Sequence, residues 1–234
     1  MSLNQITIAA EPVQSASEVH LRNDRKGHVV PHHFETATQA YEASKLGVWL
    51  FLVTEILMFG GLFVAYIVFR ALNPQAFAEA SHHLDKVMGA INTVVLIASS
   101  FTMAMAVNET RHDRVKRASY FLLATLFFAS VFLVIKYFEY THKIHAGLLP
   151  AGYFTYEGLS HEKGKLFFSL YFLMTGLHGS HVLVGMGLIF WMFLKCRFKS
   201  LSSTYFTPVE MVGIFWHLVD LIWIYLFPLL YLIG

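Results

Sequence analysis

The sequence predicts an all-α, polytopic membrane protein with five transmembrane helices. Its composition is 56% hydrophobic and only 14% charged, whereas soluble domains carry about 25% charged residues. It also contains apolar stretches long enough to cross a ~30 Å hydrocarbon core at ~1.5 Å per helical residue. We expect the spans near residues 46–69, 87–107, 118–140, 166–194 and 212–233.

Residues 1–43 are predicted to form a polar arm outside the bilayer, and residues 44–234 to form the membrane domain. The arm contains proline and glycine but has no sustained apolar periodicity, so an irregular structure is expected. It lacks a secretory signal, and the first membrane helix is expected to direct insertion. Its histidines lack zinc-finger spacing and are expected to be solvated: His20, His28, His32 and His33.

The first span is organised around Glu55, the only acidic or basic residue between Lys45 and Arg70. A carboxylate near mid-membrane costs several kcal/mol unless it is paired, protonated or hydrated. No cationic side chain lies one turn away on the same helix. Two interpretations are open: a structural acid held by hydrogen bonds, or an acid that serves a proton or lipid site.

Later spans carry polar residues at helical spacing. Asn73-Pro74 is predicted to end the first helix. In the third span, Lys136 and Glu139 are three residues apart, share one helix face and are expected to pair near the membrane interface. Near the end of the last span, Pro228 is predicted to introduce a kink.

Two histidine motifs mark the fourth and fifth spans. His178 and His181 are three residues apart, as are His217 and Asp220. We favour a structural role, in which a histidine bonds Asp220 and joins the two spans. Local pairing of His217 with Asp220 within the last span would explain these two residues equally well. Metal or haem ligation is the alternative, but it needs further ligands from other helices.

No catalytic residue and no metal site are predicted in this chain. The single cysteine, Cys196, forms no internal disulfide and no paired-cysteine metal site, and is expected to be an inert thiol. The sequence lacks a nucleophile elbow, a phosphate-binding loop and a zinc-protease signature. The net charge of +2 without a basic, aromatic surface argues against nucleic-acid binding.

Lysine and arginine are unevenly distributed between the two sides of the predicted bundle. Five spans put the termini on opposite sides, and the positive-inside rule places the N-terminus in the cytoplasm and the C-terminus outside. The N-terminal side carries Arg22, Arg25, Lys26, Lys45, Arg111, Arg114, Lys116, Arg117, Lys195, Arg197 and Lys199. The opposite side carries Arg70, Lys86, Lys143, Lys163 and Lys165.

Five segments, in order, resemble subunit III of haem–copper respiratory oxidases. They are LGVWLFLVTEILMFGGLFVAY, INTVVLIASS, KYFEY, TGLHGSHVLVG and FWHLVDLIWIYLF, and the resemblance covers about residues 44–234. The last two together are highly specific. The chain looks like the five-helix bacterial form that lacks the first two of the family's seven helices, which implies a bacterial cytoplasmic membrane.

The resemblance implies a subunit with no redox centre of its own. Haem and copper would reside in subunits I and II, and subunit I would be the main contact. A two-plus-three arrangement of the helices would hold phospholipid in the cleft between the two groups, with Trp49, Phe59 and Arg197 as candidate lipid contacts. Glu55 matches the family's intramembrane carboxylate, and the histidines and Asp220 match positions assigned to packing.

The resemblance further implies an accessory subunit of a proton-pumping terminal oxidase that reduces oxygen to water. Cytochrome c or quinol would donate electrons to the complex, and Glu55 favours cytochrome c modestly, since the quinol branch often has another acid there. A nitric-oxide reductase-type complex is a close alternative. Rivals from other classes are a proton-coupled transporter, for which no inverted repeat is evident, and a membrane di-metal oxidase.

Overall fold

The computed structural model describes residues 22–23, 29–30, 37–149, 161–198 and 207–233. The histidines predicted in the arm lie outside these residues. Contacts divide the chain into a unit Met1–Ser44 and a unit Lys45–Gly234. In the first unit, β1 (Arg22–Asn23) pairs antiparallel with β2 (Val29–Val30).

The second unit is helical, and five of its helices are long and apolar enough to span a membrane. This confirms the predicted all-α fold with five spans. The elements are α1 (Ala37–Leu72), α2 (Pro74–Ser81), α3 (Lys86–Arg111), α4 (Val115–His145), α5 (His161–Arg197), α6 (Thr207–Phe227) and the π-helical turn η2 (Pro228–Leu232).

Proline marks two of the helix boundaries. Pro74 occupies the first turn of α2, where its missing N–H costs nothing, so the break expected at Asn73-Pro74 separates two helices. The short helix α2 itself was not predicted, because its sequence is too polar and short to give a clear apolar pattern. Pro228 opens η2, and the last span therefore changes helical type there.

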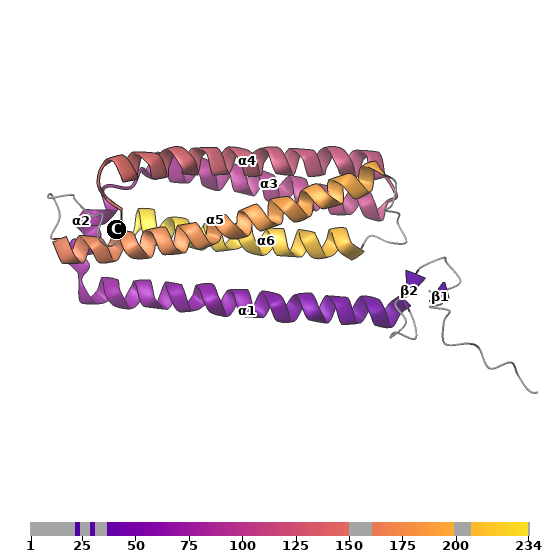
Figure 1. Cartoon of the computed structure of the whole chain (residues 1–234), viewed down its shortest axis with the longest axis horizontal. Coiled ribbons are helices and arrows are strands. Elements are labelled where there is room, and N and C mark those ends of the chain that lie inside the picture. Colours follow the sequence, from indigo (N-terminus) through magenta and orange to yellow (C-terminus); the bar gives the residue numbers. More distant parts are fainter. Residues whose placement is uncertain (1–21, 24–28, 31–36, 150–160, 199–206, 234) are drawn as a thin grey trace, which may run out of the picture. The chain divides into compact units, whose positions relative to one another are not determined.

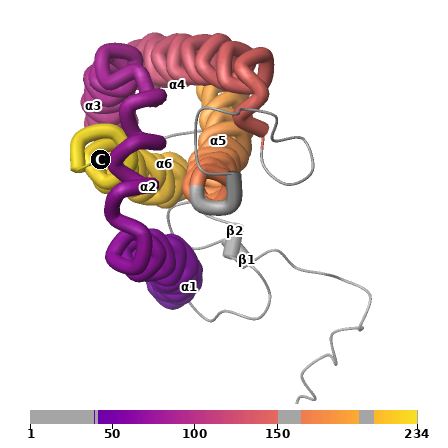
Figure 2. The backbone as a smooth tube through the Cα atoms, turned by 90° about the vertical axis from the view of Figure 1, so that its left-hand side faces the viewer, coloured from indigo at the N-terminus to yellow at the C-terminus, as the bar shows by residue number. Residues whose placement is uncertain are grey.

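The helices α3, α4, α5 and α6 form a ring, and α1 lies beside it (Figures 1 and 2). Neighbours around the ring pack closely along their backbones, whereas α1 makes few close backbone approaches. It meets the ring through large side chains. Phe51 packs on Phe215 of α6 with ring centroids 5.9 Å apart, and Tyr66 packs near Phe167 of α5 at 6.3 Å.

The expected two-plus-three grouping is not shown, since α3 packs along α4 more extensively than on any other element. A turn of three residues joins these two helices and makes them antiparallel neighbours. The lipid cleft expected between these spans stays a prediction.

Aromatic rings and small residues hold α6 in the ring. Trp216 and Trp223 are fully buried, and their indole N–H groups donate to Ser99 and Thr93 of α3, both at 3.1 Å. On the α5 side, the ring of Trp216 lies directly against Gly185. A Cβ added there would meet ring carbons at 2.7 Å, so the close approach of α5 to α6 requires glycine.

Replacement of Gly185 by alanine should therefore destabilise the protein by about 1–3 kcal/mol, since the rigid indole cannot move aside. The matched control is Gly187→Ala on the same helix, where an added Cβ meets nothing within 4 Å. That change should be neutral or stabilise by up to ~1 kcal/mol, because alanine favours the helix. Thermal unfolding of the purified protein in detergent measures both, and equal shifts would contradict the packing argument.

Candidate functional site

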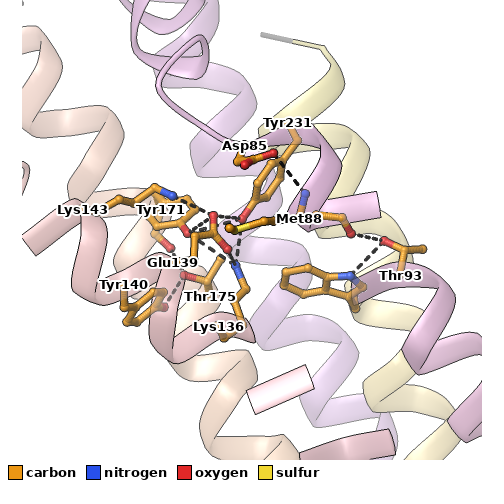
Figure 3. A network of polar contacts seen from close by, with 12 residues as sticks. Asp85, Met88, Thr93, Lys136, Glu139, Tyr140, Lys143, Tyr171, Thr175 and Tyr231 are labelled. Atoms are coloured by element: carbon orange, nitrogen blue, oxygen red, sulfur yellow. Dashed lines mark hydrogen bonds and ion pairs between the residues drawn. The ribbon is translucent and has the colours of Figure 1, made fainter. Parts of the chain in front are cut away.

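The most extensive polar cluster is built around Glu139 of α4, near the end of the bundle that holds the C-terminus (Figure 3). Oε2 accepts a hydrogen bond from Lys136 at 2.8 Å, and Oε1 accepts one from Lys143 at 2.7 Å. Two tyrosine hydroxyls also donate to Oε1, from Tyr171 of α5 at 2.9 Å and Tyr231 of η2 at 2.6 Å. One carboxylate therefore joins three elements.

Lys136 lies deep in the same cluster. Its ammonium donates to the Tyr231 hydroxyl at 2.8 Å and lies 4.6 Å from the ring centre of Trp223. The aromatic face and the tyrosine hydroxyl take the place of the water that a lysine normally needs. The cluster thus makes a charged side chain tolerable about two and a half turns inside the end of α4.

Asp85, the N-cap of α3, adds a second negative charge close to Lys143 (Figure 3). Two carboxylates and two ammonium groups then balance at this end of the bundle. The sequence indicated the Lys136–Glu139 pair but not the other members. Lys143 was assigned to the loop, although its i, i+4 spacing from Glu139 is a signal for pairing; Tyr171 and Tyr231 had no such signal.

Glu55 of α1 is bonded to His181 of α5. Its Oε2 lies 2.9 Å from His181 Nε2, and the two side chains are 13% and 17% exposed. Phe59 packs edge-on against the same imidazole at 5.4 Å. Together these contacts form a polar link between α1 and the ring.

The number of protons shared by Glu55 and His181 can be deduced from the contact of the second imidazole nitrogen, Nδ1. His181 Nδ1 lies 2.8 Å from the carbonyl oxygen of Leu177, which can only accept, so Nδ1 carries a hydrogen. The contact of Nε2 with Glu55 then needs one proton, held either by the imidazole or by the carboxyl group. In both forms the pair has no net charge, and the acid is therefore tolerated at mid-membrane.

The remaining motif residues lie in separate places. His178 is fully buried between the rings of Phe132 and Trp223, and neither ring nitrogen has a hydrogen-bond partner among the described residues. His217 Nδ1 contacts the Ser100 hydroxyl of α3 at 2.7 Å. Asp220 is buried with no bonded oxygen in the described part of the chain.

The expected bond from a histidine of the fourth span to Asp220 is therefore wrong, as is local pairing of His217 with Asp220. Residues three apart differ by about 60° around a helix, so His178 points between α4 and α6 while His181 points to α1. The imidazole of His217 contacts Ser100 of α3 and not Asp220 of its own helix, because the Ser100 hydroxyl lies within hydrogen-bonding distance.

A family model described as cytochrome c oxidase subunit III matches residues 25–234. The chain belongs to this family. A cytochrome c oxidase subunit 3 from Thermostichus vulcanus is 35% identical over 189 residues, which cover 80% of this chain and 86% of the relative. That from Synechocystis sp. is 32% identical over 188 residues, covering 80% and 74%. A "Probable quinol oxidase subunit 3" from Staphylococcus haemolyticus is 24% identical over 200 residues, covering 86% and 94%.

As a member of the subunit III family, the chain is an accessory subunit of a terminal oxidase. In the described ranges, no group of three or more His, Cys, Asp or Glu side chains is placed to hold a metal ion. Cys196 is a free, buried thiol near the end of α5.

Of the three residues expected to contact lipid, two are exposed and Phe59 is covered by protein. Trp49 is 52% exposed on α1. Phe59 is almost fully buried and lies against His181, about 15 Å further along the helix at ~1.5 Å per residue. Arg197 is exposed at the last residue of α5.

We expect Glu139→Gln to destabilise the protein by about 3–5 kcal/mol, because a neutral amide leaves the buried Lys136 ammonium without a counter-charge and leaves Lys143 with Asp85 alone. The control is Glu210→Gln in the ion pair with Arg111, whose side chain is 51% exposed. This change should cost only ~0–1 kcal/mol. Chemical unfolding in detergent compares the two, and similar costs would refute the structural role of the Glu139 cluster.

For the link to α1, Glu55→Gln should stay within ~1 kcal/mol of the parent, since an amide N–H can still donate to His181 Nε2. Glu55→Leu should cost about 1–3 kcal/mol because the imidazole loses its partner. Glu55→Lys should prevent assembly. Thr54→Val at the neighbouring exposed position is the control, with an expected change below ~0.5 kcal/mol. A fully tolerated Glu55→Leu would show that the link is dispensable.

Proposed function

We propose that this subunit acts as a scaffold that stabilises the haem-bearing subunit I of a proton-pumping terminal oxidase and carries no redox group itself. The observation behind this proposal is that its intramembrane polar groups form hydrogen bonds between helices. Glu139, Glu55, His181 and His217 all bond to side chains of other elements of the chain. Groups used in this way hold helices together and are not arranged for chemistry.

The proposed complex reduces oxygen to water with electrons from cytochrome c. Relatives named for cytochrome c oxidases, at 35% and 32% identity, support this donor. The second candidate is a quinol-driven complex, which the Staphylococcus relative favours by its name and by its coverage of 94% of that protein. In either case the donor would react with subunits I and II and not with this chain.

We also propose a multi-pass location in a bacterial cytoplasmic membrane, with the N-terminus inside. The excess of Lys and Arg on the N-terminal side of the bundle supports this orientation. Phospholipid is proposed as a bound partner, and the exposed Trp49 and Arg197 are the candidate contacts for acyl chain and phosphate. Phe59 would contribute only by supporting α1, because its ring is covered by protein.

Purification through an affinity tag under mild detergent tests the proposal. Haem-containing subunits should co-purify in a fixed ratio, and the complex should consume oxygen with reduced cytochrome c or with quinol, which identifies the donor. Detergent strong enough to strip this subunit should leave the haem spectrum in place and shorten the lifetime of activity during turnover. Purification of the chain without any haem protein, together with proton-coupled uptake in vesicles, would favour a transporter instead.

A further inference from the structure

The outer seam between α3 and α6 contains a buried carboxyl group, that of Asp220, with no hydrogen-bond partner in the described part of the chain. A groove of about 410 Å³ runs along it, with Ser100 from α3 and His217 and Asp220 from α6 among its lining residues. A second groove of about 220 Å³ continues from it, shares Ala104 and His217, and reaches Arg111. From Leu96 to Arg111, the combined length is about 22 Å at ~1.5 Å per residue.

Asp220 is the unusual member of this seam. It is 2% exposed, and neither carboxylate oxygen has a hydrogen-bond partner in the described part of the chain. The Ser100 hydroxyl is near enough to interact with the Asp220 carboxyl, but it also contacts His217 Nδ1 at 2.7 Å. By contrast, Glu55 and Glu139 of the other spans are both bonded to partners in other helices.

Depth in the membrane limits what can complete this group. Asp220 lies at the middle of the candidate span Pro208–Leu232, and Ser100 lies near the middle of Lys86–Arg111. Lipid headgroups stay at the two interfaces, and acyl chains offer no hydrogen-bond donor. At this depth, a donor for the carboxyl group has to come from protein.

The rim of the groove is apolar and exposed. Ile97, Phe101 and Leu221 are 51%, 66% and 49% exposed, so a helix placed along the seam would cover them while it reached Asp220. We propose that this seam receives a transmembrane helix of another subunit of the oxidase complex, whose hydrogen-bond donor side chain completes Asp220. The proposal rests on the proposed function, because it requires that the chain sits in such a complex.

Site-specific photocrosslinking in the purified complex tests the contact. The photoreactive residue p-benzoylphenylalanine replaces Phe101 in the groove or, as matched control, Phe127 on α4. The two rings are 66% and 63% exposed, and both lie about three helical turns from the α3–α4 turn. Mass spectrometry then identifies the crosslinked product.

The expected result is an adduct from position 101 to another subunit of the complex, at least tenfold above that from position 127, which should react with lipid. Adducts from position 101 to lipid only, to a second copy of this chain, or in no greater yield than the control would overturn the proposal. Haem in the purified wild-type complex is checked first. Its absence would refute the proposed function itself, whereas haem with a lipid-only adduct would refute the seam alone.

Substitution of Asp220 gives an independent readout. Asp220→Leu should lower retention of the subunit in the complex about tenfold during detergent washing, because the donor of the partner helix loses its acceptor. Asp220→Asn keeps a carbonyl oxygen and should retain the subunit within about twofold of wild type. Retention of the leucine variant equal to that of wild type would contradict the proposal.

Discussion

The carboxylate of Glu139 is the contact on which the arrangement of the helices depends most. Hydrocarbon supplies no hydrogen bonds, so two lysines and an acid in one helix are tolerated only if other elements complete their shell. Tyr171 and Tyr231 do so, and they bring α5 and the C-terminal turn against α4. The same contacts that neutralise the charge therefore determine which helices are neighbours. In an otherwise apolar bundle, the polar cluster also fixes the relative depth and rotation of these helices.

Elsewhere the ring is held by close packing of small against large groups. Gly185 admits the ring of Trp216, and Gly89 admits that of Phe227, so α6 approaches both of its neighbours closely. The first span is different, because it reaches the ring mainly through aromatic side chains and the bond from Glu55 to His181. A neutral acid–imidazole pair suits this position, since it is directional and introduces no net charge into the membrane.

Membership of the subunit III family explains why some polar groups are bonded within the chain and another is not. An accessory subunit needs surfaces that are completed by its partners. The polar groups around Glu139 are bonded within the chain, whereas the Asp220 carboxyl on the outer seam has no hydrogen-bond partner in the described part. That contrast distinguishes groups that maintain this chain from a group that is available to another.

The sequence by itself determined the number and approximate place of the spans, because hydrophobicity is a local property and a helix needs about 20 residues to cross the bilayer. It also indicated the Lys136–Glu139 pair, whose spacing within one helix is fixed. Only the tertiary structure decided the one-plus-four arrangement and the partners of the polar residues. Glu55 and His181 are 126 residues apart, and Lys136 and Tyr231 are 95 apart. Such contacts depend on the rotation and depth of each helix in the bundle. The apolar pattern does not determine that rotation or depth, because an apolar helix face is as stable against lipid tails as against another helix.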